Sequence, residues 1–388
     1  MKIIRPIEIT DAILTGSSVV EDDYDEFVMG TTYSEGDTVM VTSGNEILTL
    51  DVAPATDWDP GDIITGQTST ETCVAVLKIT ALTYYVRERS GAFTLGEIIG
   101  VTGTPAKLAD QGLAHPTFTA PTDNIHKVYE SVSGSNTGNF PTLDVLDTVP
   151  NWLDLGYNNR WKTFDEIIES QTTAEVDITY QFTPGQSVNS IAFMNMENIS
   201  KVRIVSTDPV DGVVYDFTKD LVATEPSGLS GVVDWYSYFF SSVILISDFW
   251  VTDLPPYLNT VIDITLTYGG DTSSIGEIVL GLSADFGNTL YSPSIGIHDY
   301  SIKEQNSFGQ WVIAERSFSK KMTCDVTVEN ASIPHVVRLL AYYRAKPLVY
   351  IGSDEYESLA VYGYVKDWNT VISYPEYAIL TIEVAGLI

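Results

Sequence analysis

The sequence of 388 residues contains little cysteine and little histidine. Its two cysteines, Cys73 and Cys324, lie far apart in strand-like sequence, so we expect both to be buried free thiols. This count does not support a disulfide framework, and no cysteine spacing indicates a metal site. The four histidines share no motif, which favours structural roles for all of them: His115, His126, His298 and His335.

Basic residues are scarce beside acidic ones. The sequence holds 20 Lys and Arg against 52 Asp and Glu, a formal net charge of −32 at pH 7. Residues 1–60 alone carry thirteen acidic side chains against Lys2 and Arg5. Such a surface repels phosphate backbones, so we expect no binding to nucleic acid. Solubility is the simplest role for this charge, and attraction to a basic partner subunit or to divalent cations is the alternative.

Long apolar runs are missing. The most apolar stretch, Tyr236–Val251, is interrupted by serines and by Asp248, and it is too short and too polar for a membrane span. Residues 1–6 contain no apolar core of signal-peptide length, so export by that route is not expected. The sequence therefore predicts a soluble protein that is assembled in a reducing cytosol.

Enzyme signatures are also missing. The sequence has no nucleotide-binding glycine loop, no His-Glu-x-x-His and no Gly-x-Ser-x-Gly elbow. Acidic pairs such as Asp144 with Asp147 are expected by chance among 52 carboxylates, and nothing else indicates glycoside hydrolysis. We therefore expect no catalytic residues, no cofactor and no metal.

Residues that favour strands are abundant. The sequence holds 22 Tyr, 14 Phe and 7 Trp, and 44% of its residues are hydrophobic, which excludes a disordered chain. Val, Ile and Thr are frequent, and long Ala/Leu/Glu/Lys runs are absent. This composition predicts a mainly β, multi-domain protein.

One motif is divided between two distant parts of the sequence. The first part is Phe27–Val39, with the letters FVMGTTYSEGDTV. The second part comprises Val128–Ser131, Gly138–Pro141 and Asn151–Gly156. Joined end to end, the parts resemble a small carbohydrate-binding β module. The resemblance implies such a module over residues 24–44 and 125–157, with turns formed by Gly-containing segments.

The segment between the halves, residues 45–124, is expected to be an inserted small β domain. It contains a weak repeat, in which Asp57–Gly66 (DWDPGDIITG) resembles Ala92–Gly100 (AFTLGEIIG). Each copy has an aromatic residue, a Gly-acid turn and an Ile-Ile strand, and two further strand candidates lie between the copies. A small barrel or sandwich of short strands fits this pattern.

The flanking segments complete the expected domain organisation. Residues 1–23 are expected to form an N-terminal arm with one strand, and residues 158–310 a jelly-roll-type β-sandwich. A clear alternation at Val261–Tyr268 before two glycines is typical of a strand that enters a hairpin. Residues 311–388 predict an α+β unit with one helix, which begins after Ser332 and is able to continue the sheet of the sandwich.

The divided motif resembles a family 5/12 carbohydrate-binding module of the chitin-binding type. Followed by Asn158–Asp165, the pattern is similar to structural proteins of tailed bacteriophages, and segments such as Arg344–Gly352 and Val361–Asp367 resemble the end of the same proteins. The resemblance covers nearly the whole chain apart from the insert. It implies a virion structural protein.

The resemblance also implies a candidate sugar site. In the carbohydrate-binding family, exposed aromatic rings stack on sugars, and the matching positions here are Phe27, Tyr33, Tyr129 and Trp152. A glycan site requires at least two of the rings of Tyr33, Tyr129 and Trp152 to face solvent on one side. Of these three, Trp152 is expected to be the most buried and Tyr129 is the best candidate for exposure. The alternative is that these rings form the core of a purely architectural module.

The expected function is a structural component of the phage tail, at the distal tail or tail tip, that joins the tail to fibres and contacts host surface glycans. The implied partners are tail-tube, tail-tip or fibre proteins and further copies of the chain in a symmetric homo-oligomer, with the virion tail as the location. Two alternatives stay open: a dedicated host-adsorption lectin, and a head decoration or collar protein. A polysaccharide depolymerase is less favoured because long parallel β-helix repeats are absent.

Overall fold

The computed structural model describes residues 1–42, 44–94, 96–110, 117–119, 125–221, 245–305, 308–354 and 356–388. The protein is mainly β, as the composition predicts. It folds as two compact units, one of residues 1–20 and 159–388 and one of residues 21–158. His115 and residues 236–244 of the apolar run lie outside the described residues. No helix in the described ranges is both long enough and apolar enough to span a bilayer.

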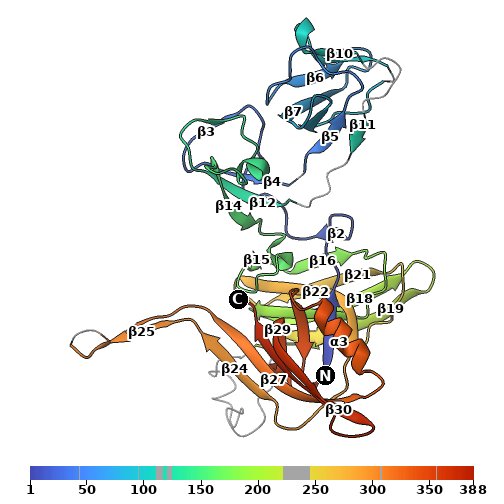
Figure 1. Ribbon diagram of the computed structural model, residues 1–388, viewed down its shortest axis with the longest axis vertical. Helices are drawn as coiled ribbons and strands as arrows, with labels where there is room; N and C mark the ends of the chain where they lie inside the picture. The colour runs from blue at the N-terminus through green and yellow to red at the C-terminus, as the bar shows by residue number, and fades with distance from the viewer. Residues whose placement is uncertain are drawn as a thin grey trace. The chain divides into compact units, whose positions relative to one another are not determined.

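The first unit is built around an eleven-stranded sheet, here called sheet A (Figure 1). Its main path runs through β20 (Phe249–Val251), β17 (Ser190–Glu197), β22 (Ser273–Asp285), β1 (Lys2–Pro6), β28 (Leu348–Ile351), β29 (Ala360–Val371), β30 (Tyr377–Gly386), β27 (Phe318–Glu329) and β23 (Asn288–Thr289). Beside this path, β15 (Thr172–Ala174) pairs with β22, and β24 (Ser294–Asp299) pairs with β27.

Strand β1 lies inside sheet A, between β22 and β28. This differs from the expected N-terminal arm, because Ile3 and Ile4 are both fully buried, one on each face of the sheet. A strand with apolar residues on both faces is typical of the middle of a covered sheet. Sheet A therefore joins the expected sandwich and the expected C-terminal unit into one structure through β1.

Helix α3 (Ile333–Tyr342) covers one face of sheet A. Its buried residues Val336, Leu339 and Leu340 recur at helical spacing and pack with apolar residues from β27, β28 and β30. Pro334 lies in the first turn, where its missing N–H leaves no hydrogen bond unmade. The predicted C-terminal helix is therefore present.

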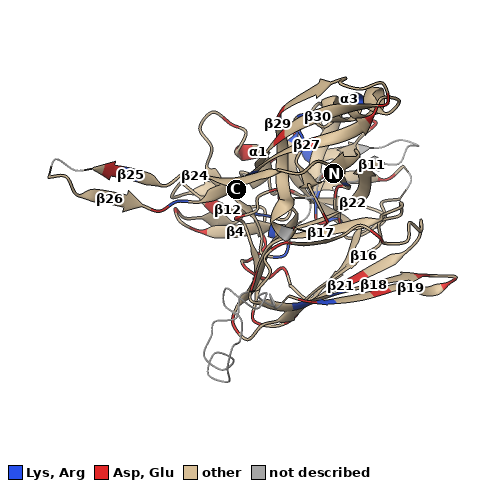
Figure 2. Ribbon diagram, turned by 90° about the horizontal axis from the view of Figure 1, so that it is seen from below, with Lys and Arg blue, Asp and Glu red and all other residues tan. Residues whose placement is uncertain are grey.

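A five-stranded sheet, here called sheet B, forms a separate layer of the same unit (Figure 2). Its order is β19 (Gly212–Asp220), β18 (Ile199–Asp208), β21 (Val261–Tyr268), β16 (Ile178–Phe182) and β2 (Leu14–Ser17). Strand β21 buries Ile262, Ile264 and Leu266 in alternation, as its sequence predicts. The two remaining strands of this unit are β25 (Ile302–Gln305) and β26 (Trp311–Ala314). Among the described strands, they pair only with each other.

The second unit contains the divided module. Strand β4 (Thr38–Val41) from the first half pairs with β12 (Lys127–Ser131) from the second half, and β14 (Trp152–Tyr157) pairs with the other side of β12. Strands β3 (Thr32–Tyr33) and β13 (Asn136–Thr137) join the halves a second time, and the short helix α1 is Pro141–Asp144. Val41 lies directly opposite Lys127, so residues 42–126 leave and rejoin the sheet at the end of one β4–β12 hairpin.

The insert forms its own sheet with its own core. The strand order is β10 (Leu108–Asp110), β9 (Ile98–Val101), β6 (Ile63–Gly66), β7 (Thr72–Lys78), β8 (Thr83–Arg87), β5 (Glu46–Thr49) and β11 (Thr117–Thr119). A short 3-10 helix, Pro105–Lys107, precedes β10. The core contains Trp58, Tyr84 and Phe93 together with Ile64 and Ile99.

One four-residue turn occurs three times in this unit. The three copies are Ser34–Asp37, Asp59–Asp62 and Thr94–Glu97. The third residue of each copy is a glycine with a positive φ, of 89°, 88° and 67° respectively. The acidic fourth residue accepts a hydrogen bond from the backbone N–H of the first residue, over 2.7, 2.8 and 2.5 Å. Glycine is required because other residues rarely adopt this conformation.

The residues around the three turns correspond as well. An aromatic residue precedes each turn (Tyr33, Trp58 and Phe93), and a strand with a buried apolar residue follows each (Val39, Ile64 and Ile99). The two copies in the insert were evident in the sequence, and the third is the turn of the divided module. The repeat is therefore a structural unit in which the aromatic residue packs beside the strand that follows it.

Both cysteines are buried free thiols, as expected. Burial raises the pKa of Cys73 to about 12 and the pKa of Cys324 to about 11. Each thiol therefore stays protonated and weakly reactive near neutral pH.

Candidate functional site

The structure brings the four predicted sugar-site residues into one aromatic cluster in the divided module. The ring centroids of Phe27 and Tyr33 are 5.5 Å apart, and those of Tyr33 and Trp152 are 5.2 Å apart. The Phe27 ring also meets Trp152 edge to face at 5.8 Å. Tyr129 belongs to the same cluster from the central strand β12. The sequence therefore selected residues that are neighbours in space.

These rings form a core and not an exposed face. Phe27 and Tyr129 are each 2% exposed and Trp152 is 1% exposed, while Tyr33 is half-buried. Trp152 is the most buried, as expected, but the expectation that Tyr129 is exposed is wrong. Tyr129 lies on the central strand β12, between β4 and β14, and its side chain packs into the aromatic cluster. The requirement that two rings face solvent is not met.

The polar atoms of the cluster are satisfied within the module. Trp152 Nε1 donates a hydrogen bond to the Asn139 carbonyl at 2.9 Å. The Tyr33 hydroxyl accepts a hydrogen bond from the Val28 N–H at 2.9 Å and donates one to the Val28 carbonyl. Buried Tyr and Trp groups need such partners, so the arrangement is typical of packing.

Residues of the insert cover the remaining edge of the cluster. Arg87, on β8, places its guanidinium carbon 4.9 Å from the ring centroid of Phe140 and 5.9 Å from that of Phe27. One Arg87 nitrogen also donates to Glu26 at 3.1 Å. Val76, from β7, packs into the same cluster. The sequence analysis missed Arg87, because a lone arginine in a strand carries no signal of the ring that it covers.

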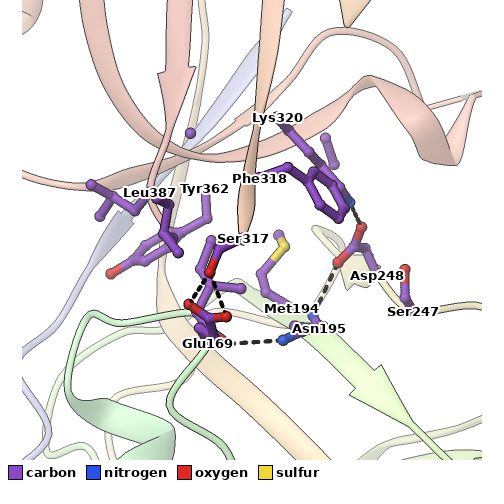
Figure 3. A pocket seen from close by; sticks show the side chains of 14 residues that line it. Glu169, Met194, Asn195, Ser247, Asp248, Ser317, Phe318, Lys320, Tyr362 and Leu387 are labelled. Atoms are coloured by element: carbon purple, nitrogen blue, oxygen red, sulfur yellow. Dashed lines mark hydrogen bonds and ion pairs between the residues drawn. The ribbon is translucent and has the colours of Figure 1, made fainter. Parts of the chain in front are cut away.

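A cavity of about 200 Å³ lies in the first unit, beside the start of β27 (Figure 3). Its apolar lining includes Met194, Phe318 and Tyr362. The Glu169 carboxylate accepts hydrogen bonds from the Ser317 hydroxyl, at 2.6 and 2.7 Å. The lining contains no histidine and no cysteine.

The second carboxylate of the cavity also has partners. Asp248 forms an ion pair with Lys320 and accepts the backbone N–H of Asn195 at 3.0 Å. Asn195 itself donates its side-chain amide to the Ile168 carbonyl at 2.9 Å. These contacts connect Lys320 on β27 and Asn195 on β17 through Asp248, which directly precedes β20. The polar lining of the cavity therefore holds neighbouring strands together.

A buried carboxyl group lies within sheet A. Glu277 is 5% exposed, and its Oε2 has no hydrogen-bond partner in the described part of the chain. Burial, followed by the nearby charges of Asp165 and Glu166, raises the pKa of Glu277 well above its ordinary range. Across the described ranges, no group of three or more His, Cys, Asp or Glu side chains is arranged to hold a metal ion. The arrangement thus favours a neutral, protonated Glu277.

A projecting hairpin exposes a large group of apolar side chains of the first unit. Residues 294–318, of which 306 and 307 are not described, run out along β24 and β25 and return along β26 to β27; this segment is called the arm below (Figure 1). Nearly all described residues of its strands are exposed. Its exposed large apolar residues are Ile295, Ile297, Tyr300, Ile302, Phe308, Trp311, Val312, Ile313 and Phe318.

The arm was not identified from the sequence. Its strands alternate weakly, and the run Trp311–Ala314 has four uncharged residues, as a buried strand would have. The turn between them contains Gly309, which has a positive φ of 79°. The signal for a hairpin was therefore present, but nothing in the pattern shows that its apolar residues face solvent.

The chain matches no protein-family model, no curated protein and no solved structure.

Proposed function

We propose that this protein is a structural component of a bacteriophage tail, located at the distal tail or tail tip, where it joins the tail to fibres. The proposal begins from the resemblance of the divided module and the C-terminal segments to phage structural proteins. Its partners would be tail-tube, tail-tip or fibre proteins and other copies of the chain. Assembly would take place in the host cytoplasm.

The observation that supports this proposal most strongly is the arm. Proteins that act alone rarely expose so many apolar residues together, and a large exposed patch typically marks an interaction site. Phe308 is 88% exposed and Trp311 is 65% exposed. An isolated two-stranded hairpin is only marginally stable in water. A protein that is built into an assembly can carry such an arm, because neighbouring proteins cover it.

The polar groups of the described cavity are engaged in contacts between strands. In the part of the chain that the structure describes, the carboxylates of the cavity bind neighbouring strands and the thiols are buried. Host-glycan contact through Phe27, Tyr129 and Trp152 is left out of the proposal, because a sugar cannot stack on rings that are 1–2% exposed.

Immunogold labelling tests the proposal. Antibodies against the purified protein would be applied to particles of the phage that encodes it, with an unrelated tailed phage as the control. We expect gold at the distal end of the tail, and the protein among the particle's components by mass spectrometry. Labelling of the capsid or neck would instead favour a head decoration or collar protein. Absence from the particle would refute the proposal.

A further inference from the structure

The inference concerns what covers the arm. Strand β26 (Trp311–Ala314) is paired with β25 on one side, and no described strand lies on its other side. Within the described part of the chain, the backbone N–H and C=O groups along that edge have no partner strand. Such an edge readily pairs with a strand from another chain. All four residues of β26 are exposed. None of them is charged, and the ribbon of this strand has the colour of uncharged residues in Figure 2.

A second strand edge without a partner among the described strands exists in the same unit. Strand β19 (Gly212–Asp220) ends the order of sheet B, and its only partner among the described strands is β18. In both Figure 1 and Figure 2, β19 and the arm lie at opposite sides of this unit. A donor strand and an acceptor edge on opposite sides are what a head-to-tail contact between copies requires.

The side chains of the two strands match in spacing. On β19, Tyr215 and Phe217 lie on one face with stacked rings 6.1 Å apart, and this row continues to Phe249 at 6.0 Å. On β26, Trp311 and Ile313 share one face, because they pair with Gln305 and Lys303 of β25. Placing β26 beside β19 would therefore set two apolar residues next to two aromatic rings on the same face.

The charges of the two strands also permit close approach. The segment from β25 to β26 carries one basic and one acidic residue, Lys303 and Glu304, so it is neutral in a molecule of net charge −32. On β19, Asp216 is paired with Arg203 at 2.8 Å, and Asp220 with Lys201 at 3.3 Å. Two copies that repel each other elsewhere can meet here without a direct clash of like charges.

We propose that β26 of one copy adds to the free edge of β19 in a second copy, so that the copies join arm to edge. Trp311 and Ile313 then lie beside Tyr215 and Phe217 of the neighbour, and Val312 and Ala314 lie on the opposite face. This proposal rests on the proposed function only for the location of the contact in the phage tail. The contact itself requires only copies of this chain.

The surface available is sufficient for a specific contact. At about 150–250 Å² per aromatic side chain, the exposed fractions of the four aromatic residues of the arm add to roughly 500 Å². A standard interface buries about 800 Å² per partner. The five aliphatic residues of the arm and the edge of β19 supply the remainder. Because each copy both gives an arm and receives one, the contact can close into a ring.

Cysteine cross-linking tests the contact. The substitutions Ala314→Cys and Thr218→Cys place thiols on exposed positions of the arm and of the edge, on the faces that the proposal brings together. Background is low because both native cysteines are buried. With a short bismaleimide reagent, we expect a ladder of linked copies from the full-length double variant at high concentration, and no linkage from either single variant. Dimers from Ala314→Cys alone would show arm-to-arm pairing and overturn the proposal.

Complementation by mixing gives an independent test. An arm variant (Trp311→Asp with Ile313→Asp) keeps a free edge, and an edge variant (Phe217→Asp) keeps a functional arm. Each should remain monomeric alone, while their mixture should form dimers that do not extend. Val213→Lys, which is exposed at the start of β19, replaces Phe217→Asp if that change unfolds the sheet. Val210→Asp, in the turn before β19, is the matched control and should leave assembly unchanged.

The outcomes separate this proposal from the proposed function. Linked copies of the purified protein support the arm-to-edge contact even if immunogold labelling places the protein outside the tail. If the double cysteine variant gives no ladder either in concentrated solution or in assembled particles, the contact does not exist, whatever the location of the protein. Slowed amide exchange in β19 of the assembled form would further identify strand addition.

Discussion

At the scale of single residues, Trp152 shows how an aromatic residue that suggested a binding face is used for packing. It is 1% exposed, meets Phe27 and Tyr33, and donates to the Asn139 carbonyl. We expect Trp152→Ala to reduce the free energy of unfolding of residues 21–158 by about 3–5 kcal/mol, as a large-to-small core change does. Chemical denaturation followed by circular dichroism would measure the loss.

The matched control for Trp152 is Tyr33→Ala, since Tyr33 belongs to the same cluster but is half-buried. Its loss should be smaller, because less apolar surface leaves water when the ring packs. If Trp152→Ala proved as stable as the wild-type protein, the ring would not be a core residue, and a binding role would return to consideration.

Glu277 gives a second prediction at this scale. Below the ordinary carboxyl pKa, the folded and unfolded chains both hold its proton, so Glu277→Gln should change little. At higher pH the unfolded chain releases the proton while the folded chain retains it, because burial raises the pKa of Glu277. The contribution of Glu277 to the free energy of unfolding therefore falls by about 1.4 kcal/mol for each rise of one in pH, until the raised pKa is reached.

The measurement for Glu277 is the melting temperature as a function of pH. Glu277→Gln should melt at a higher temperature than the wild-type protein at neutral pH, and the two should converge at acidic pH. The exposed Glu376→Gln is the control and should follow the wild-type curve. A variant that is less stable at neutral pH would indicate that the ionised carboxylate is needed in the folded state.

At the scale of elements, the insert leaves the module at the end of a hairpin. Val41 and Lys127 are opposite each other, so a short Gly/Ser linker in place of residues 45–124 can close β4 and β12 directly. We expect a folded protein whose first unit is unchanged in melting temperature. The module itself should be less stable, because Val76 and Arg87 no longer cover its aromatic cluster. Global unfolding or insolubility would contradict this prediction.

A single substitution in the intact protein measures how much of the stability lost on deletion of the insert comes from Arg87. Arg87→Ala removes the guanidinium from Phe140 and Phe27 and also breaks the ion pair with Glu26. A loss of about 1–2 kcal/mol is expected, since cation–π contacts are stronger when water is excluded. Any larger loss in the deletion variant then comes from the packing of β7 on the module.

Local sequence patterns were sufficient to predict those elements whose signal lies within a single segment. The alternation at Val261–Tyr268, the helix after Ser332 and the Gly-acid turns of the insert are local signals, and the structure has each of them. Pairing between distant segments is not a local signal. Nothing in Lys2–Pro6 shows that its neighbours are strands some 280 and 350 residues later.

The candidate site illustrates the same limit. The sequence identified four aromatic residues that do cluster in the structure. It did not determine their exposure, which depends on Arg87 and Val76 from the insert. The arm was not predicted because the uncharged run Trp311–Ala314 is typical of a buried strand. In the structure all four of its residues are exposed.

At the scale of the whole molecule, the two compact units are expected to unfold separately. Each has its own sheets and its own apolar clusters. Scanning calorimetry should therefore show two transitions, and residues 21–158 expressed alone should reproduce one of them. A single transition that is shared by all probes would mean that the units stabilise each other strongly.

The net charge of the molecule predicts a salt dependence. Residues 21–158 carry 21 acidic and five basic residues, a net charge of −16, which is half of the total of −32. Self-repulsion of this kind weakens as salt screens it. Both transitions should therefore move to higher temperature between low and physiological ionic strength. A fall with added salt would indicate that specific ion pairs outweigh the repulsion.

The position of β1 has a consequence for synthesis on the ribosome. Lys2–Pro6 emerges before both of its neighbours, yet it must wait for β22 and finally for Leu348–Ile351. At about 5–20 residues per second, that delay is roughly 20 to 70 s. During this interval Ile3 and Ile4 cannot be buried in sheet A, because its other strands have not all been made. The synthesis of residues 21–158 ends well before Leu348–Ile351 is made. A strand that is made before both of its neighbours is thus among the last of sheet A to be placed, and the nascent chain depends on keeping it unpaired until the sheet can close around it.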